Sequence, residues 1–128
     1  MPVAVHPDPA GRFVLLTITD PYSIDEWRRG LEAVFREPLF LKRARVLVDR
    51  RSCAPPTASA VAEMVDFLSE HRPEVATSRT AVVVGDEAAF GFGRMMALRT
   101  ELADLTAEIK VFREYDAGVY WLTTGQPV

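Results

Sequence analysis

The sequence has little cysteine, histidine and lysine, and these scarcities exclude several kinds of protein. Cys53 is the only cysteine among 128 residues, so no internal disulfide can form, which fits a reducing compartment. The two histidines, His6 and His71, stand far apart, and neither has the spacing to another histidine or cysteine that typifies a metal site. Arginine supplies nearly all of the 15 basic residues, and the net charge of −3 argues against a nucleic-acid-binding protein, which usually carries a basic face.

Long apolar runs are lacking as well. No run approaches the roughly 18 residues that a membrane-spanning helix needs, and the first residues lack the charged and apolar segments of a secretory signal. We therefore expect a cytoplasmic protein without integral membrane association. The length predicts one domain over residues 1–128, with a core at about 12–122.

Short apolar runs rich in β-branched residues predict the strands. The clearest is Val46-Leu47-Val48, which leads into Asp49 and reads as a strand of residues 44–49 buried on both faces. A loop with two prolines and a glycine separates two earlier runs, which indicates a hairpin. The other predicted strands comprise residues 3–6, 12–19, 79–85 and 109–112.

Helical periodicity fills the intervals between these strands. Ser23 followed by Glu26 is a capping box, and it opens a first amphipathic helix that ends before Pro38. Gly30 inside this helix would permit close approach to a neighbour. Thr57 or Ser59 caps a second helix. The apolar stripes predicted to face the core are Ile24, Trp27, Leu31, Val34 and Phe35, then Val61, Met64, Val65 and Leu68.

The third helix is predicted to run from residue 87 or 88 to 105, and a final short helix occupies 115–122. The core stripe expected for the third helix is Met95, Leu98, Leu102 and Leu105, with Phe92, Met96 and Ala103 on an adjoining flank. Strands that alternate with helices call for crossover connections. The predicted fold is therefore α/β, with a mixed, mostly parallel four- to five-stranded sheet, an N-terminal hairpin and helices packed against the sheet.

Four segments in this order resemble the SpoIIAA-like family, also described as STAS/SEC14-like domains. The resemblance covers about residues 12–122, and the segments are Val46–Arg51, Arg79–Val84, Phe90–Met95, and Val111-Phe112-Arg113 with Ala117 and Trp121-Leu122. It implies a four- or five-stranded mixed sheet with helices against it. In the anti-sigma-factor antagonists of this fold, a serine at the start of the helix after a buried strand is phosphorylated. Ser52, Thr57 and Ser59 lie near that place here, but the Asp-Ser-Ser-Gly pattern is absent.

Several side chains are candidates for a binding site, each with a plainer alternative. Asp49 and Arg50 would bind an anion or a charged partner, or Asp49 would instead accept hydrogen bonds from its own loop. A phosphate on Ser52, Thr57 or Ser59 would suit a helix N-terminus, although N-capping explains the same residues. Near Phe90, the segment Phe-Gly-Phe-Gly lacks the third glycine of a dinucleotide site. Phe92 and Met96 would line an apolar pocket or a dimer surface, or would complete the core.

The sequence thus predicts a non-enzymatic regulatory or binding module with no metal and no cofactor. Our first hypothesis is protein–protein interaction, including a homodimer, through Phe92, Met96 and the loop of residues 50–59. The alternative is a small apolar or lipid-like carboxylate ligand between the second and third helices, with its charge met by Arg50 or Arg94. Catalysis would require Cys53 and His71 within hydrogen-bond reach.

Overall fold

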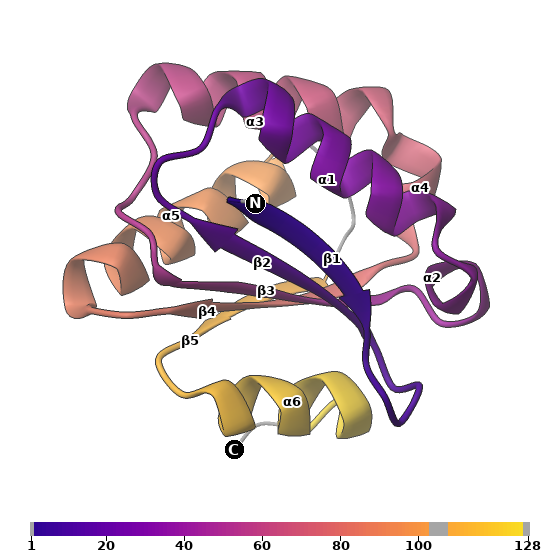
Figure 1. Ribbon diagram of the computed structural model, residues 1–128. Coiled ribbons are helices and arrows are strands. Elements are labelled where there is room, and N and C mark those ends of the chain that lie inside the picture. Colours follow the sequence, from indigo (N-terminus) through magenta and orange to yellow (C-terminus); the bar gives the residue numbers. More distant parts are fainter. Residues whose placement is uncertain (1, 103–107, 127–128) are drawn as a thin grey trace.

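Five strands form a single sheet in the order in which they occur along the chain (Figure 1). The computed structural model describes residues 2–102 and 108–126. β1 pairs with β2 in an antiparallel hairpin, and the remaining neighbours are parallel. The predicted fold class is confirmed. The strands are β1 (Val3–Pro7), β2 (Val14–Thr19), β3 (Arg45–Ser52), β4 (Arg79–Val84) and β5 (Glu108–Phe112).

The sequential strand order determines where the helices lie. Parallel neighbours are joined by right-handed crossovers, and successive crossovers in one direction place their helices on the same face. Accordingly α1 (Ile24–Arg36), α3 (Ala58–Glu70) and α5 (Glu87–Leu102) cover one face, and α6 (Tyr115–Thr124) covers the other (Figure 1). In the described ranges, no helix has the length and apolar character needed to cross a membrane.

The inner strands β3 and β4 are neighbours in the sheet. Val46 lies opposite Thr80, and Val48 lies opposite Val82. Side chains of β3 alternate between the two layers: Val46 and Val48 pack in the cluster beneath α1 and α3, whereas Leu47 packs in the cluster with α6. The sheet therefore separates two apolar cores, one on each face, and Leu47 is fully buried.

Helix α1 begins and packs as predicted. The Ser23 hydroxyl accepts a hydrogen bond from the Glu26 N–H, and the Glu26 carboxylate accepts one from the Ser23 N–H, which completes the capping box. Gly30 lies against the hairpin, because a Cβ atom there would stand 2.5 Å from Val3 Cγ1 and 3.3 Å from Leu16 Cδ1. The absence of a side chain at Gly30 therefore sets the distance between α1 and β1.

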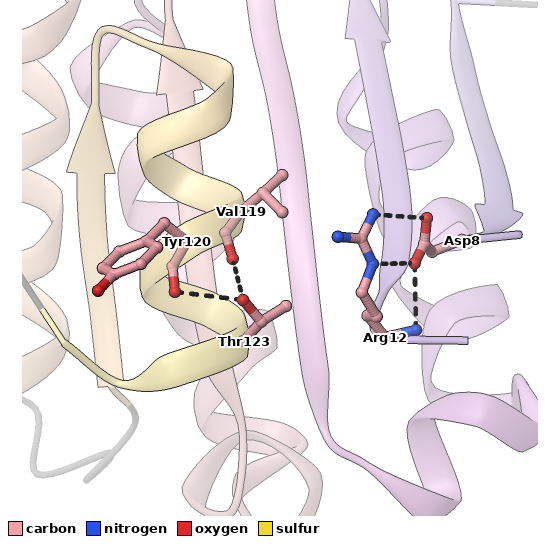
Figure 2. A network of polar contacts seen from close by, with 5 residues as sticks. All are labelled: Asp8, Arg12, Val119, Tyr120 and Thr123. Atoms are coloured by element: carbon pink, nitrogen blue, oxygen red, sulfur yellow. Dashed lines mark hydrogen bonds and ion pairs between the residues drawn. The ribbon is translucent and has the colours of Figure 1, made fainter. Parts of the chain in front are cut away.

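Two separate groups of polar contacts, one in the β1–β2 loop and one within α6, lie around the layer that α6 covers (Figure 2). In the β1–β2 loop, Arg12 Nε donates to Asp8 Oδ2 at 2.7 Å, and the Arg12 hydrogen bond lowers the pKa of Asp8. Within α6, the Thr123 hydroxyl donates to the Val119 carbonyl at 2.9 Å. The apolar residues of this layer are Phe13, Leu47, Ala81, Val83, Phe112, Trp121 and Leu122.

Two short helices were not predicted, and one strand boundary needs correction. Residues 39–41 belong to the short helix α2 (Pro38–Lys42), and the short helix α4 (Arg72–Ala76) follows α3. Each helix has five residues, too few to show a helical period. Strand β3 continues to Ser52 rather than ending at Asp49, because it pairs with β4 through Arg50 and with β2 through Ser52, which lies opposite Thr19.

The predicted orientation of α5 is also wrong. Met95 and Leu98 were expected in the core but are 42% and 54% exposed. Phe92 and Met96 face the interior instead. Helix α5 is apolar on more than one side, so the periodicity does not determine which side meets the sheet. The rest of the predicted stripe and flank lies outside the described side chains: Leu102, Ala103 and Leu105.

Candidate functional site

An apolar cavity of about 160 Å³ lies between the sheet and the helices above it. Its floor comes from consecutive parallel strands, with Val48 on β3 and Val82 on β4. Its walls include Met64 on α3 and Phe92 and Met96 on α5. The valines of the floor have short side chains that do not fill the space between the layers.

Small residues on α5 help to leave this space open. Ala89, Gly93 and Ala97 all line the cavity, and a Cβ atom on Gly93 would stand only 2.9 Å from Val111 on β5. The helix therefore approaches the sheet closely at Gly93 without sending a large side chain into the gap. The size of the cavity thus depends on the spacing between α5 and the sheet.

Arg50 is the charged residue of the cavity wall. It is half-buried near the end of β3, and its Nη2 donates to the Tyr22 hydroxyl at 3.0 Å and to the Ala54 carbonyl at 3.3 Å. The guanidinium also lies over the Tyr22 ring, 5.4 Å from its centroid. Both acceptors are neutral, and no ion pair among the described side chains of residues 2–99 and 108–126 includes Arg50. The cavity thus has a positive charge in its wall with no described counter-ion.

Strand alternation sends Asp49 to the opposite face. Its carboxylate accepts hydrogen bonds from Arg51 Nε at 3.0 Å, from Arg51 Nη2 at 2.9 Å and from the Arg51 backbone N–H at 3.1 Å. The Arg51 side-chain hydrogen bonds lower the pKa of Asp49, although partial burial opposes them. Arg51 also lies 4.9 Å from the centroid of the Tyr115 ring. Asp49 and Arg51 therefore satisfy each other beside α6, away from Arg50.

The three residues predicted as phosphate acceptors follow Arg51 in the sequence, and all three are exposed. Ser52 ends β3. Thr57 is the N-cap of α3, where its hydroxyl accepts a hydrogen bond from the Ala60 N–H at 3.2 Å. Ser59 lies 3.3 Å from it, measured between the two hydroxyl oxygens. The structure therefore gives Thr57 a capping role, and Ser52 and Ser59 remain accessible.

Arg94 and Met96 are near neighbours in sequence but differ in position. Met96 is partly buried and lines the cavity, as Phe92 does. Arg94 is exposed and is not part of the cavity wall. The structure thus brings Arg50, Phe92 and Met96 to one cavity and leaves Arg94 outside it.

Cys53 lines the cavity near Arg50, but its thiol is not activated. Burial raises the pKa of Cys53 to about 11, and the neighbouring Asp20 carboxylate adds to this, while Arg50 opposes it. The thiol donates to Asp20 Oδ1 at 3.6 Å. His71 has other partners, since its Nδ1 lies 3.0 Å from the Phe67 carbonyl and its ring packs 4.2 Å from the Phe67 ring. The contacts of Cys53 and His71 are those of structural side chains.

Sequence reasoning missed two residues that shape the rim of the cavity. Tyr22 positions Arg50, and Asp20 accepts a hydrogen bond at 2.7 Å from the N–H of Ala54, in the loop that lines the cavity. The segment of residues 20–23 was interpreted only as the break between a strand and the helix that Ser23 caps. No local pattern could show that it meets a loop more than 30 positions later along the chain.

Comparisons with known proteins leave the site to be interpreted from its own geometry. Among the described residues, no group of three or more histidine, cysteine or acidic side chains is arranged to hold a metal ion. The chain matches no protein-family model, no curated protein and no solved structure at a significant level.

Proposed function

We propose that this domain binds a small apolar ligand in the cavity between α3, α5 and the sheet. The observation that carries the proposal is the cavity itself, which has about 160 Å³ of space and a largely apolar wall. Engineered cavities of about this volume stay dry and take up benzene, because water gains too few hydrogen bonds inside them. Burial of six methylene-sized groups contributes about 5 kcal/mol, which corresponds to a dissociation constant of about 0.2 mM before other contacts are added.

Titration with toluene as a neutral probe, followed by amide NMR, tests this function. We expect saturable shifts at floor and wall positions such as Val82 and Met96. Val82→Phe places a ring in the cavity and should abolish these shifts, while Leu98→Phe, on the exposed side of α5, should leave them unchanged. Met96→Trp provides a second filling variant, and circular dichroism checks that each variant is folded. Toluene that fails to bind, or that binds Val82→Phe as tightly as the unmodified chain, would refute ligand binding in this cavity.

We propose protein–protein interaction as a second function, supported by a different observation. Met95 and Leu98 lie one helical turn apart on α5 and are both largely exposed, in contrast to Phe92 and Met96 on the same helix. A homodimer through this face is the simplest form of the proposal. Sedimentation of the unmodified chain and of Leu98→Asp tests it: we expect self-association that the variant removes. A monomer at all concentrations would exclude the homodimer.

We also propose that the chain is a SpoIIAA-like regulatory domain without enzymatic activity, located in the cytoplasm. The five-stranded mixed sheet agrees with what the sequence resemblance implies. The raised pKa of Cys53 supports the absence of a nucleophile. Exposed Ser52 and Ser59 support regulation by phosphorylation. Mass spectrometry of the chain isolated from its host tests this last point: phosphate confined to Ser52 or Ser59 would support it, and unmodified peptides under all growth conditions would contradict it.

A further inference from the structure

Arg50 indicates the chemical class of the ligand. We infer that the cavity takes a small carboxylate whose apolar body is about the size of one ring, and that the carboxylate binds the Arg50 guanidinium. This inference rests on the proposed ligand-binding function and adds the charge and the size of the ligand to it.

The charge of Arg50 is only partly compensated. The side chain is half-buried, and its described acceptors are the neutral hydroxyl of Tyr22 and the neutral carbonyl of Ala54. Removing a guanidinium from water without an anion costs free energy, and a carboxylate in the cavity would recover it. The Asp20 carboxylate lies close enough to act on Cys53 together with Arg50, but among the described side chains no hydrogen bond or ion pair joins it to Arg50; its oxygens accept from the Ala54 N–H and the Cys53 thiol.

The guanidinium also has donors to spare. Both described hydrogen bonds come from Nη2, and in the described part of the chain Nε and Nη1 donate to no protein atom. Arginine presents five N–H groups in a planar fork that matches the two oxygens of a carboxylate. An anion therefore gains hydrogen bonds here without first breaking those that hold Arg50 to Tyr22 and Ala54. This is the geometry of a side chain already positioned for a ligand.

The volume limits the rest of the molecule. A cavity of about 160 Å³ holds one aromatic ring or a short branched chain, by comparison with engineered cavities that hold benzene. A long acyl chain is too large. Near Arg50 the wall includes Ala54 and Pro55, which are exposed, so the charged side of the cavity lies beside the protein surface. The ligand would place its carboxylate there and its apolar body over the valines of the floor.

Calorimetric titration with benzoate and with benzamide, which has the same shape and no charge, tests the inference. A charge-assisted hydrogen bond favours benzoate over benzamide by about 10- to 100-fold in affinity. Arg50→Gln should remove this preference. Arg94→Gln loses the same charge at an exposed position outside the cavity, so it should retain the preference. Toluene binding to Arg50→Gln, measured in parallel, shows that the cavity of this variant is intact.

The outcomes separate the inference from the function on which it rests. Equal binding of benzoate and benzamide, or a preference that persists in Arg50→Gln, overturns the carboxylate assignment while ligand binding stands. Failure of toluene, benzamide and benzoate alike overturns both. Dodecanoate, whose chain exceeds the cavity, should not displace benzoate, and displacement would overturn the size limit.

Discussion

Replacing Gly30 with alanine measures how closely α1 packs on the hairpin. Two effects oppose each other. Alanine inside a helix is favoured over glycine by about 1 kcal/mol. The new methyl group, however, would stand 2.5 Å from Val3 Cγ1, about 1 Å inside a normal carbon–carbon contact. Overpacking of this kind costs about 1–3 kcal/mol. We therefore expect Gly30→Ala to destabilise the domain by about 1 kcal/mol net, a fall of roughly 4 °C in Tm for a chain of this size.

Val3→Ala provides the matched background for this measurement. It removes Cγ1, the atom that the new methyl group would meet, so Gly30→Ala should then recover most of its helix-propensity gain. The difference between the two backgrounds is a coupling free energy of about 2 kcal/mol. Urea unfolding followed by tryptophan fluorescence is a suitable assay, because Trp27 on α1 is buried. If Gly30→Ala stabilises both backgrounds equally, α1 does not pack on Val3 as described.

Three further predictions follow from contacts described above. Ser23→Ala removes the hydroxyl that accepts from the Glu26 N–H and should lower the free energy of unfolding by about 1 kcal/mol, whereas Ser23→Thr keeps a hydroxyl acceptor and should lose less; a Ser23→Ala chain as stable as the unmodified one would contradict the cap. Cys53 should react with iodoacetamide at pH 8 roughly 100-fold more slowly than an unperturbed thiol. The reaction rate should rise with pH up to the pKa of about 11, and fast alkylation at neutral pH would refute the burial of the thiol. The pKa of Asp49 is lowered in the folded chain, so the stabilising effect of its carboxylate is present above the unfolded pKa of about 3.9 and is lost as pH falls through the folded pKa. The difference in unfolding free energy between the unmodified chain and Asp49→Asn should therefore shrink in acid. A difference that grows in acid would contradict the pairing with Arg51.

The architecture could be predicted from the sequence because its signals are local and repeated. The apolar run Val46-Leu47-Val48 is short and contains two β-branched residues, which favours a strand over a helix. Ser23 with Glu26 marks the start of a helix within four residues. Once strands and helices alternate, the right-handed crossover rule leaves few arrangements. The parallel pairing of β3 with β4 follows from that alternation rather than from any single residue.

The candidate site was less accessible, because it depends on which side of each element faces the other. Arg50 and Asp49 are adjacent in sequence and were considered together, yet strand alternation places them on opposite faces of the sheet. Helix α5 offers two apolar sides, and periodicity favoured the side of Met95 and Leu98, which is exposed. The preference for Phe92 and Met96 arises from the close approach of Gly93 to Val111, a contact between segments that no local pattern reports.

The sequential strand order has a consequence for synthesis on the ribosome. Each strand pairs with the one made just before it, so the sheet can grow in the direction of translation. Each parallel pairing must nevertheless wait for the helix between its two strands, and such pairings between distant segments form slowly. Helix α6 is the exception, since the face that it covers on β3 and β4 is complete well before α6 emerges. During that interval Leu47, Ala81 and Val83 remain open to solvent or to a chaperone, and late docking of α6 is the step at which a nascent chain of this kind is most exposed to aggregation.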